Sequence, residues 1–418
     1  MTLIRLPKNA FLLKSCQILP LNRTTNNITL SFVGFALKAI CALALSWMAA
    51  NNLPVDEFAI WAIFFSISMV LSSGDLGVGQ YILTYMASSD DDSSAFAMHF
   101  FNGLSSLIVL SAPVFVLGLI IAKSRGFEIA FAFPLCILVA SRIPLIAYGA
   151  FMQVQNRIHE KRLIDSAPYC LAIPIMYIMY SYDVGVYSQL LVINLLLTLG
   201  GIVTMQRCNV LGVPKFQWAG LAILKSTLKK SLPYLLNNAS GIVIYGGFIT
   251  LFSFYLDNYQ IAVLAIYHSV ILSLGYQAYD VVFRSFQLRI SEAKVFKGLS
   301  LFLGFSAFII MIALNEAGVK ILQFLFANYT FEQFDLMLFA LFACLEFGYL
   351  LATTRLQMSV SGSTILSRCS ITKLLTFLVM MVCMVYLDVV TILVLCYCLI
   401  AFSGFNLLYL YFSRKLIA

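Results

Sequence analysis

The sequence has few of the charged side chains that keep a protein surface in water. Only 11% of its 418 residues are Asp, Glu, Lys or Arg, and only three are histidine, whereas soluble domains carry about 25% charged residues. In contrast, 61% of the residues are hydrophobic and the mean hydropathy is +0.95. The composition excludes a soluble multidomain protein and indicates a membrane protein whose apolar surface meets lipid.

Residues that make metal or nucleotide sites are also scarce. The ten cysteines are too few for a disulfide scaffold in a chain of this length, and Cys396 and Cys398 form a C-x-C pair with no histidine at zinc-site spacing. The glycine-rich stretch Gly74–Gln80 lacks the GK[ST] ending of a phosphate loop. We therefore expect no metal and no cofactor.

The hydrophobic residues gather in runs that are long enough for membrane helices, which need about 20 apolar residues. The runs are continuously apolar and lack the strict alternation of a membrane β-barrel. The sequence therefore predicts an all-α polytopic membrane protein of about twelve transmembrane helices. The predicted spans cover residues 28–50, 58–83, 96–122, 129–150, 166–182, 188–206, 233–254, 260–283, 298–317, 334–354, 374–387 and 389–412.

The basic residues outside the spans predict the orientation of the chain. With the N-terminus in the cytoplasm, the cytoplasmic segments hold 21 Lys and Arg residues and the outward segments hold three. Such an excess is typical of cytoplasmic loops, so we expect both termini to be cytoplasmic. The net charge of +8 is spread over these short clusters, which argues against a nucleic-acid partner.

The longest cytoplasmic segment, 207–232, divides the chain into two sets of six spans. Within it, Trp218, Leu221 and Leu224 recur at helical spacing before a group of lysines, which predicts an amphipathic helix on an anionic membrane surface. The predicted organisation is an N-terminal arm 1–27, a first bundle 28–206, the linker 207–232, a second bundle 233–412 and a tail 413–418.

An internal repeat supports this division. Aligning Glu57–Ser72 with Gln260–Gly275 gives five identities in sixteen positions at an offset of 203 residues, close to half the chain. An even number of spans separates the two segments, so they cross the membrane in the same direction. The sequence thus predicts two halves related by a parallel pseudo-two-fold axis, with a central cleft between them, as in some secondary transporters.

Two cations lie inside predicted spans of the first half. Lys38 is ten residues into span 1, and Arg142 lies in span 4 just before Pro144. An ionisable side chain in hydrocarbon costs at least about 2.5–3.5 kcal/mol and needs a partner or a watery cavity. Two interpretations remain open: both line a cleft that binds an anionic group, or they are buried against a carboxylate such as Asp75.

The inner end of span 2 combines glycines with a carboxylate. Gly74, Gly77 and Gly79 surround Asp75, and each glycine weakens a helix by about 1 kcal/mol relative to alanine. Freed backbone groups in a membrane must face protein or water. We predict a hinge here, with Asp75 acting either as the structural partner of a cation or in ion coupling.

The second half offers fewer charged candidates. Glu346 lies within span 10, and we predict a role for it in ion coupling. Asp280 and Arg284, four residues apart, fit an ion pair at a helix end and are secondary site candidates. His268 is either a proton relay or a hydrogen-bonded core residue.

Two segments carry a resemblance to a known family. Asn51–Gln80 resembles the region from span 1 to span 2 of Wzx-type O-antigen flippases, which belong to the multidrug/oligosaccharidyl-lipid/polysaccharide exporter (MOP) superfamily, and Asp75–Gly77 matches their D-x-G turn. Val319–Gln333 resembles their segment between spans 9 and 10. Ala327 replaces the glycine usual there, and Phe58-Ala59 stands where Tyr-Gly is common.

The resemblance implies that the chain moves undecaprenyl-diphosphate-linked O-antigen repeat units from the cytoplasmic to the periplasmic leaflet of the bacterial inner membrane, in lipopolysaccharide biosynthesis. It implies alternating access, a proton or sodium counter-ion, membrane lipid, and the polymerase and chain-length regulator of the same pathway as partners. Two alternatives stay open: an ion-coupled exporter of small cationic molecules from the same superfamily, and an integral membrane O-antigen polymerase. An exporter of cations requires carboxylates in its cleft, whereas a flippase for a diphosphate requires cations there. The sign of the charge inside the membrane therefore distinguishes the exporter from the flippase.

Overall fold

The described part of the chain is helical throughout. The computed structural model describes residues 21–72, 75–87, 93–155, 157–213, 216–241, 247–273, 317–357, 360–387 and 390–415, and these residues contain no strand. The elements are α1 (Leu21–Asn52), α2 (Val55–Ser72), α3 (Val78–Ala87), α4 (Ser93–Ser124), α5 (Ile129–Ser141), α6 (Ile146–Val154), α7 (Ile158–Ser181), α8 (Val186–Val210), α9 (Leu221–Gly241), α10 (Phe248–Phe252), α11 (Asn258–Tyr267), the π-helix η2 (His268–Ser273), α14 (Gln333–Gln357), α15 (Val360–Tyr386) and α16 (Ile392–Lys415).

Among these residues, seven helical segments are long and apolar enough to cross a membrane. Large hydrophobic side chains such as Ile120, Tyr177 and Val382 are exposed along them, which is unfavourable in water and suits hydrocarbon. The all-α polytopic fold is therefore confirmed. Spans 260–283 and 298–317 extend beyond the described residues, so the number twelve stays a prediction.

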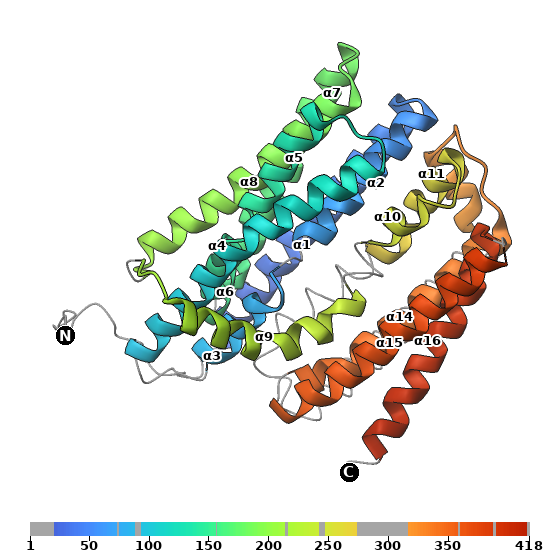
Figure 1. Ribbon diagram of the computed structural model, residues 1–418. Coiled ribbons are helices and arrows are strands. Elements are labelled where there is room, and N and C mark those ends of the chain that lie inside the picture. The colour runs from blue at the N-terminus through green and yellow to red at the C-terminus, as the bar shows by residue number, and fades with distance from the viewer. Residues whose placement is uncertain are drawn as a thin grey trace.

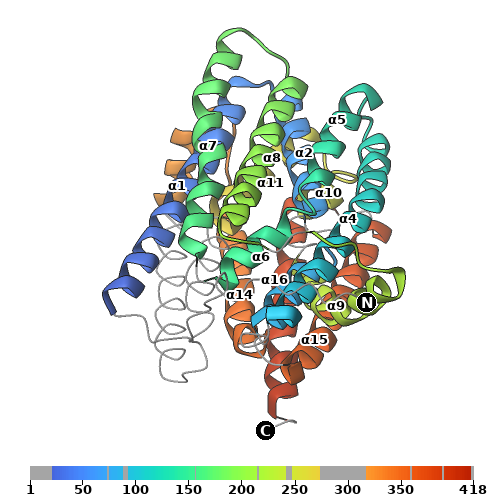
Figure 2. The same ribbon diagram turned by 90° about the vertical axis from the view of Figure 1, so that its left-hand side faces the viewer.

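The helices form two halves. Helices α1 to α8 make one bundle, α10 to α16 belong to the other, and α9 crosses between them (Figures 1 and 2). The two repeat segments, α2 and α11, pack against each other at the boundary. Their first turns are joined by a hydrogen bond of 2.7 Å from Asn258 Nδ2 to Asp56 Oδ1. The two helices thus begin at the same end, as the parallel repeat requires.

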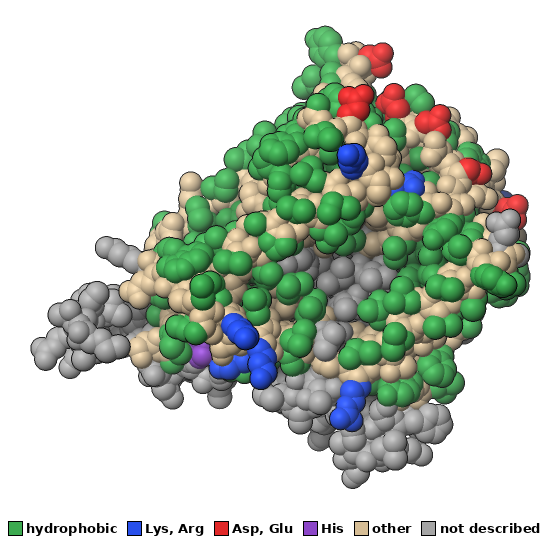
Figure 3. Space-filling view, in the orientation of Figure 1, with side chains coloured by type: hydrophobic (Ala, Val, Ile, Leu, Met, Phe, Trp, Pro, Cys, Tyr) green, Lys and Arg blue, Asp and Glu red, His purple; other side chains and the backbone are tan. Residues whose placement is uncertain are grey.

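Hydrogen bonds join the two halves near this end. Arg125 Nη2 donates to the carbonyl of Ser253 at 2.5 Å, and Asn51 Nδ2 donates to the carbonyl of Leu325 at 2.9 Å. On the face shown in Figure 3, acidic side chains gather at this end, and the largest group of Lys and Arg lies at the opposite end.

Predicted span 2 consists of two helices rather than one. The chain leaves the helix after α2 and turns through Leu76 and Gly77, whose φ angles are +48° and +75°. The Asp75 carboxylate accepts hydrogen bonds from the backbone N–H of Gly77 at 3.3 Å and of Gly79 at 2.9 Å. Asp75 therefore caps the start of α3, as acidic residues commonly do at a helix N-terminus. Gly74 lies outside the described residues.

Predicted span 4 is interrupted as well. Helix α5 ends at Ser141 and α6 begins at Ile146, with tight turns between them in which the N–H of Leu145 bonds to the carbonyl of Arg142 at 3.1 Å. Pro144 has no N–H to continue an α-helix. The break places Arg142 at a helix junction within the bundle.

Two predicted spans begin too late in the sequence. Helix α7 begins at Ile158, not 166, and α15 begins at Val360, not 374. Lys161 and Lys373, which the topology prediction places in cytoplasmic loops, therefore lie on helices, and so do Arg162 and Arg368. Hydropathy places the start of a span after its last charged residue, and this is why both starts are predicted too late. In the folded protein, an ion pair lowers the cost of a charge in a buried helix, so Lys161 and Lys373 can lie within helices.

Helix α9 covers the end of the predicted linker 207–232, and the predicted domain borders stay predictions. Helix α9 begins at Leu221 and crosses the predicted border at 232–233 without a break, with Pro233 inside it. Its amphipathic character is present: Leu224 is buried, whereas Leu221 and Lys225 are exposed.

The turn at Gly77 generates a stability prediction. A Cβ added there would lie 2.5 Å from the backbone nitrogen of Leu235 on α9. We expect Gly77→Ala to cost about 1–2 kcal/mol for the positive φ and a further 1–3 kcal/mol for the clash. The measurement is the thermal unfolding temperature of the purified protein in detergent.

Gly126→Ala is the matched control, because Gly126 has a φ of +78° with no atom within 4 Å of the added Cβ. The stability of this variant should fall only by the cost of the positive φ, without the cost of a clash. Equal losses in the two variants would contradict the close packing of α3 against α9.

Candidate functional site

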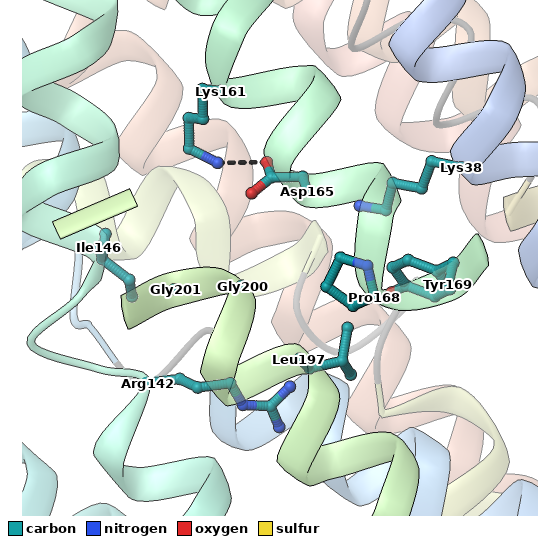
Figure 4. A pocket seen from close by; sticks show the side chains of 10 residues that line it. All are labelled: Lys38, Arg142, Ile146, Lys161, Asp165, Pro168, Tyr169, Leu197, Gly200 and Gly201. Atoms are coloured by element: carbon teal, nitrogen blue, oxygen red, sulfur yellow. Dashed lines mark hydrogen bonds and ion pairs between the residues drawn. The ribbon is translucent and has the colours of Figure 1, made fainter. Parts of the chain in front are cut away.

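A cavity of about 280 Å³ lies inside the first half of the protein. Its described walls come from α1, the α5–α6 junction, α7 and α8 (Figure 4). The lining residues are Lys38, Arg142, Ile146, Lys161, Asp165, Pro168, Tyr169, Leu197, Gly200 and Gly201. The structure thus brings Lys38 and Arg142 to one cavity. The described lining residues all belong to the first half, and the predicted cleft between the halves stays a prediction.

Lys38 lies on α1 and is half-buried. Its Nζ is 5.5 Å from the ring centroid of Tyr169 on α7, within the range of a cation–π contact. No carboxylate of the described residues lies within ion-pair distance of Lys38. Figure 4 shows its amino group extending toward the side of the cavity where Asp165 lies. The Lys38 side chain therefore lies against the ring of Tyr169 and lines the cavity.

Arg142 is positioned by a neutral amide. Its Nη2 donates to Asn194 Oδ1 at 3.0 Å, while its Nε is buried without a hydrogen-bond partner. Asn194 is 1% exposed, and its own amide donates to the carbonyl of Leu190 at 2.8 Å. This second bond orients Oδ1 toward the guanidinium. The charge of Arg142 is thus held in place without a carboxylate among the described residues.

Lys161 and Asp165 form an ion pair on successive turns of α7, drawn as the dashed line in Figure 4. Their side chains are 29% and 25% exposed. Gly149 on α6 makes room for this lysine, because a Cβ at Gly149 would lie 2.6 Å from Lys161 Cε. The sequence interpretation missed both residues. The i, i+4 spacing of opposite charges was the signal that α7 starts before them.

The cavity therefore has an excess of positive charge. Three cations, Lys38, Arg142 and Lys161, face one carboxylate, Asp165, and the rest of the lining is uncharged. At an effective dielectric constant of about 20, two unit charges 5 Å apart interact by roughly 3 kcal/mol. An anion with more than one negative charge is the ligand that this arrangement favours.

The hinge candidates lie beside the cavity. A Cβ on Gly79 would be 2.8 Å from both Asp75 Oδ2 and Ile146 Cγ2, so the start of α3 packs against a residue of the cavity wall. The hydrogen bonds of Asp75 to Gly77 and Gly79 are those of a helix cap. The predicted roles of Gly74, Gly77 and Gly79 as a hinge and of Asp75 in ion coupling stay predictions.

Glu346 lies in the second half, away from the cavity lining. It is 0% exposed on α14; its Oε2 accepts from Lys373 Nζ on α15, and its Oε1 from Ser403 Oγ on α16, each at 2.5 Å. Lys373 is 1% exposed, and its Nζ lies 4.1 Å from the ring centroid of Tyr349. Glu346 thus belongs to a buried ion pair that joins three helices, and its role in ion coupling stays a prediction.

The remaining candidates are dispersed. His268 is buried at the start of η2, with its ring centroid 6.3 Å from that of Phe248. Asp280 and Arg284 lie outside the described residues. No group of three potential metal ligands occurs within the ranges that the structure describes.

Comparison with known proteins identifies the fold. No family model and no curated protein matches the chain. Among solved structures, the MATE multidrug transporter DinF-BH aligns with a TM-score of 0.67 at 13% identity, over 93% of this chain and 94% of that one. The eukaryotic MATE transporter AtDTX14 aligns with a TM-score of 0.62 at 12% identity, over 94% and 100%. The chain has the MATE transporter fold.

A third solved structure shares this fold. A MOP superfamily transporter from Pyrococcus furiosus aligns with a TM-score of 0.53 at 15% identity, over 94% of this chain and 95% of that one. The reverse polarity of the binding pocket in that transporter suggests a different function for it. Identities this low show the fold alone, and these structural neighbours are transporters of the MOP superfamily, not enzymes.

The buried pair in the second half generates a prediction. Lys373→Met should cost about 3–5 kcal/mol of stability, because it leaves the Glu346 carboxylate buried without its cation. The double variant Lys373→Met/Glu346→Leu should recover most of this loss, because neither charge remains. Thermal unfolding of the wild type, both single variants and the double variant measures the coupling. Additive losses would show that the two side chains do not stabilise each other.

Proposed function

We propose that this chain is a MOP-superfamily flippase that moves undecaprenyl-diphosphate-linked oligosaccharide from the cytoplasmic to the periplasmic leaflet of the bacterial inner membrane by alternating access. The observation that supports the proposal is the charge of the cavity. Lys38, Arg142 and Lys161 outnumber Asp165, and Arg142 is held by an uncharged amide.

The physical demand of the cargo matches this charge. A diphosphate that crosses about 30 Å of hydrocarbon must replace its lost hydration with fixed cations. The binding must also stay weak enough for release on the other side. Two cations without a carboxylate partner among the described residues, Lys38 and Arg142, together with one paired cation, Lys161, meet both requirements better than a fully complementary cage.

The MATE fold fits a small-molecule exporter equally well, so the second candidate is an exporter of the same superfamily. The cavity discriminates between cargo types, because a cationic molecule would meet three like charges and one carboxylate. An exporter with this cavity should therefore carry an anionic molecule. The O-antigen polymerase has no support from the transporter fold.

The proposal includes an orientation and partners. The end that carries most acidic side chains in Figure 3 faces the periplasm and the basic end faces the cytoplasm, with both termini cytoplasmic, in line with the positive-inside rule. Coupling to a proton or sodium ion would act through Asp75 or Glu346. The pathway's polymerase and chain-length regulator are the proposed protein partners.

The direct test is deletion of the gene in the native host. We expect loss of surface O-antigen and accumulation of single lipid-linked repeat units on the inner leaflet, because the later steps need cargo on the periplasmic side. Glycan analysis and leaflet-specific labelling give the measurement, and expression of an unrelated O-antigen flippase should restore the surface glycan. If single repeat units still reach the surface while long chains are lost, the flippase assignment is wrong.

The second test concerns the two cations. Lys38→Ala or Arg142→Ala should reduce transport at least about tenfold, because each removes a charge that opposes the cost of moving a diphosphate through hydrocarbon. Lys38→Arg and Arg142→Lys should each retain part of the activity. The measurement is complementation of the deletion strain at equal membrane abundance.

The matched control is Lys225→Ala, since Lys225 is exposed on α9 and outside the cavity lining. Full activity of both cavity alanine variants would remove the cationic-cavity mechanism, even if the deletion phenotype holds.

A further inference from the structure

The ion pairs of the described residues differ in their access to a ligand. Glu160 on α7 pairs with Arg157 at 2.5 Å and with Arg207 at 2.8 Å, and none of these residues lines the cavity. The pair in the second half, Lys373–Glu346, is almost fully buried. Within the described part of the chain, Lys161–Asp165 is therefore the ion pair whose members both line the cavity and both remain a quarter exposed.

The surroundings of this pair allow the lysine to change partner. Its carbon stem lies against Gly149, where a larger residue would collide with it. Lys38 lines the same cavity as both members of the pair. A Lys ammonium is a compact point charge on a flexible stem, so Lys161 can reach a second acceptor without a change in the helix.

We infer that Lys161 is a third ligand for the bound anion and that Asp165 holds this lysine while the cavity is empty. The inference rests on the proposed anion-binding function. It adds Asp165 as the residue that sets how much negative charge a ligand needs in order to bind Lys161. The ligand class is a diphosphate. Its oxygens accept the same charge-assisted hydrogen bonds as a carboxylate, and its higher charge lets it compete with Asp165 where a monoanion does not.

The exchange has a consequence at each stage of transport. In the empty protein, Asp165 compensates one of the three cations, so the cavity is not left with three unopposed charges. When a diphosphate binds, Lys161 turns to it. When the diphosphate leaves, Asp165 recaptures Lys161, which favours release. Asp165 thus acts as an internal competitor of the substrate.

The test is titration of the purified full-length protein in detergent with inorganic pyrophosphate, followed by isothermal calorimetry. Asp165→Asn removes the competitor and should tighten pyrophosphate binding about tenfold, or about 1.4 kcal/mol. Glu160→Gln removes a carboxylate from the same helix outside the cavity and should leave the affinity within about twofold of wild type. Unfolding temperatures establish that each variant is folded.

The contribution of Lys161 itself is measured in the Asp165→Asn background. Adding Lys161→Gln should weaken pyrophosphate binding about tenfold. Adding Lys225→Gln, which removes one positive charge from an exposed position on α9 outside the cavity lining, should have little effect. Equal effects of the two changes, or an affinity of Asp165→Asn no tighter than that of wild type, would overturn the inference.

Failure of the inference and failure of the proposed function give different results. Pyrophosphate binding that is unaffected by Asp165→Asn overturns the inference and leaves the anion site intact. Absence of pyrophosphate binding in wild type and in folded Asp165→Asn overturns the inference, whatever the deletion strain shows. A polyprenyl diphosphate should displace bound pyrophosphate at a lower concentration than added pyrophosphate does. Weaker displacement would argue against a lipid-linked cargo and would leave the role of Lys161 unchanged.

Discussion

The cost of placing a charge in hydrocarbon governs this protein. With 11% charged residues in 418, each ion inside a helix needs a partner, a dipole or water, and the structure uses three solutions. Glu346 and Lys373 neutralise each other in a sealed core. Lys161 and Asp165 do so beside a cavity. Arg142 relies on the oriented amide of Asn194. The first solution stabilises helix packing, whereas the other two leave charge that a ligand can reach.

Helix α2 connects the boundary between the halves to the cavity. Ser66 Oγ accepts a hydrogen bond of 2.8 Å from Thr250 Oγ1 on α10. Two residues later, Ser68 Oγ donates to the Asn194 oxygen that also holds Arg142, at 3.4 Å. Residues two apart lie on nearly opposite faces of a helix, so one helix thickness separates the second half from the group that positions Arg142. In the proposed alternating-access mechanism, Arg142 therefore lies next to the boundary at which the two halves would move.

Hydropathy and charge alone predict much of this fold. Continuous apolar runs require helices in a membrane, and Pro144 marks the break beside Arg142. The repeat between Glu57–Ser72 and Gln260–Gly275 predicts two helices that run in the same direction, as α2 and α11 do. Pairing is what the sequence does not reveal. Lys373 and Glu346 are 27 positions apart, so a criterion that scans one segment at a time ends the helix at the lysine. Lys161 and Asp165 are only four positions apart, so their pairing can be read from the sequence, but the place of Lys161 in the cavity depends on the room at Gly149.

The volume of the cavity limits which part of the proposed cargo it can hold. Ligand pockets for drug-sized molecules occupy about 300–1,000 Å³, so about 280 Å³ suits a charged group and not a whole oligosaccharide. In the proposed cargo, a glycan attached to that group would extend beyond the ten described lining residues. Because the fold does not determine function, the identity of the cargo rests on a few side chains. Exchanging Lys38 and Arg142 for carboxylates would leave the helices in place and reverse the sign of the ligand, so charge in this cavity carries more information about function than the fold does.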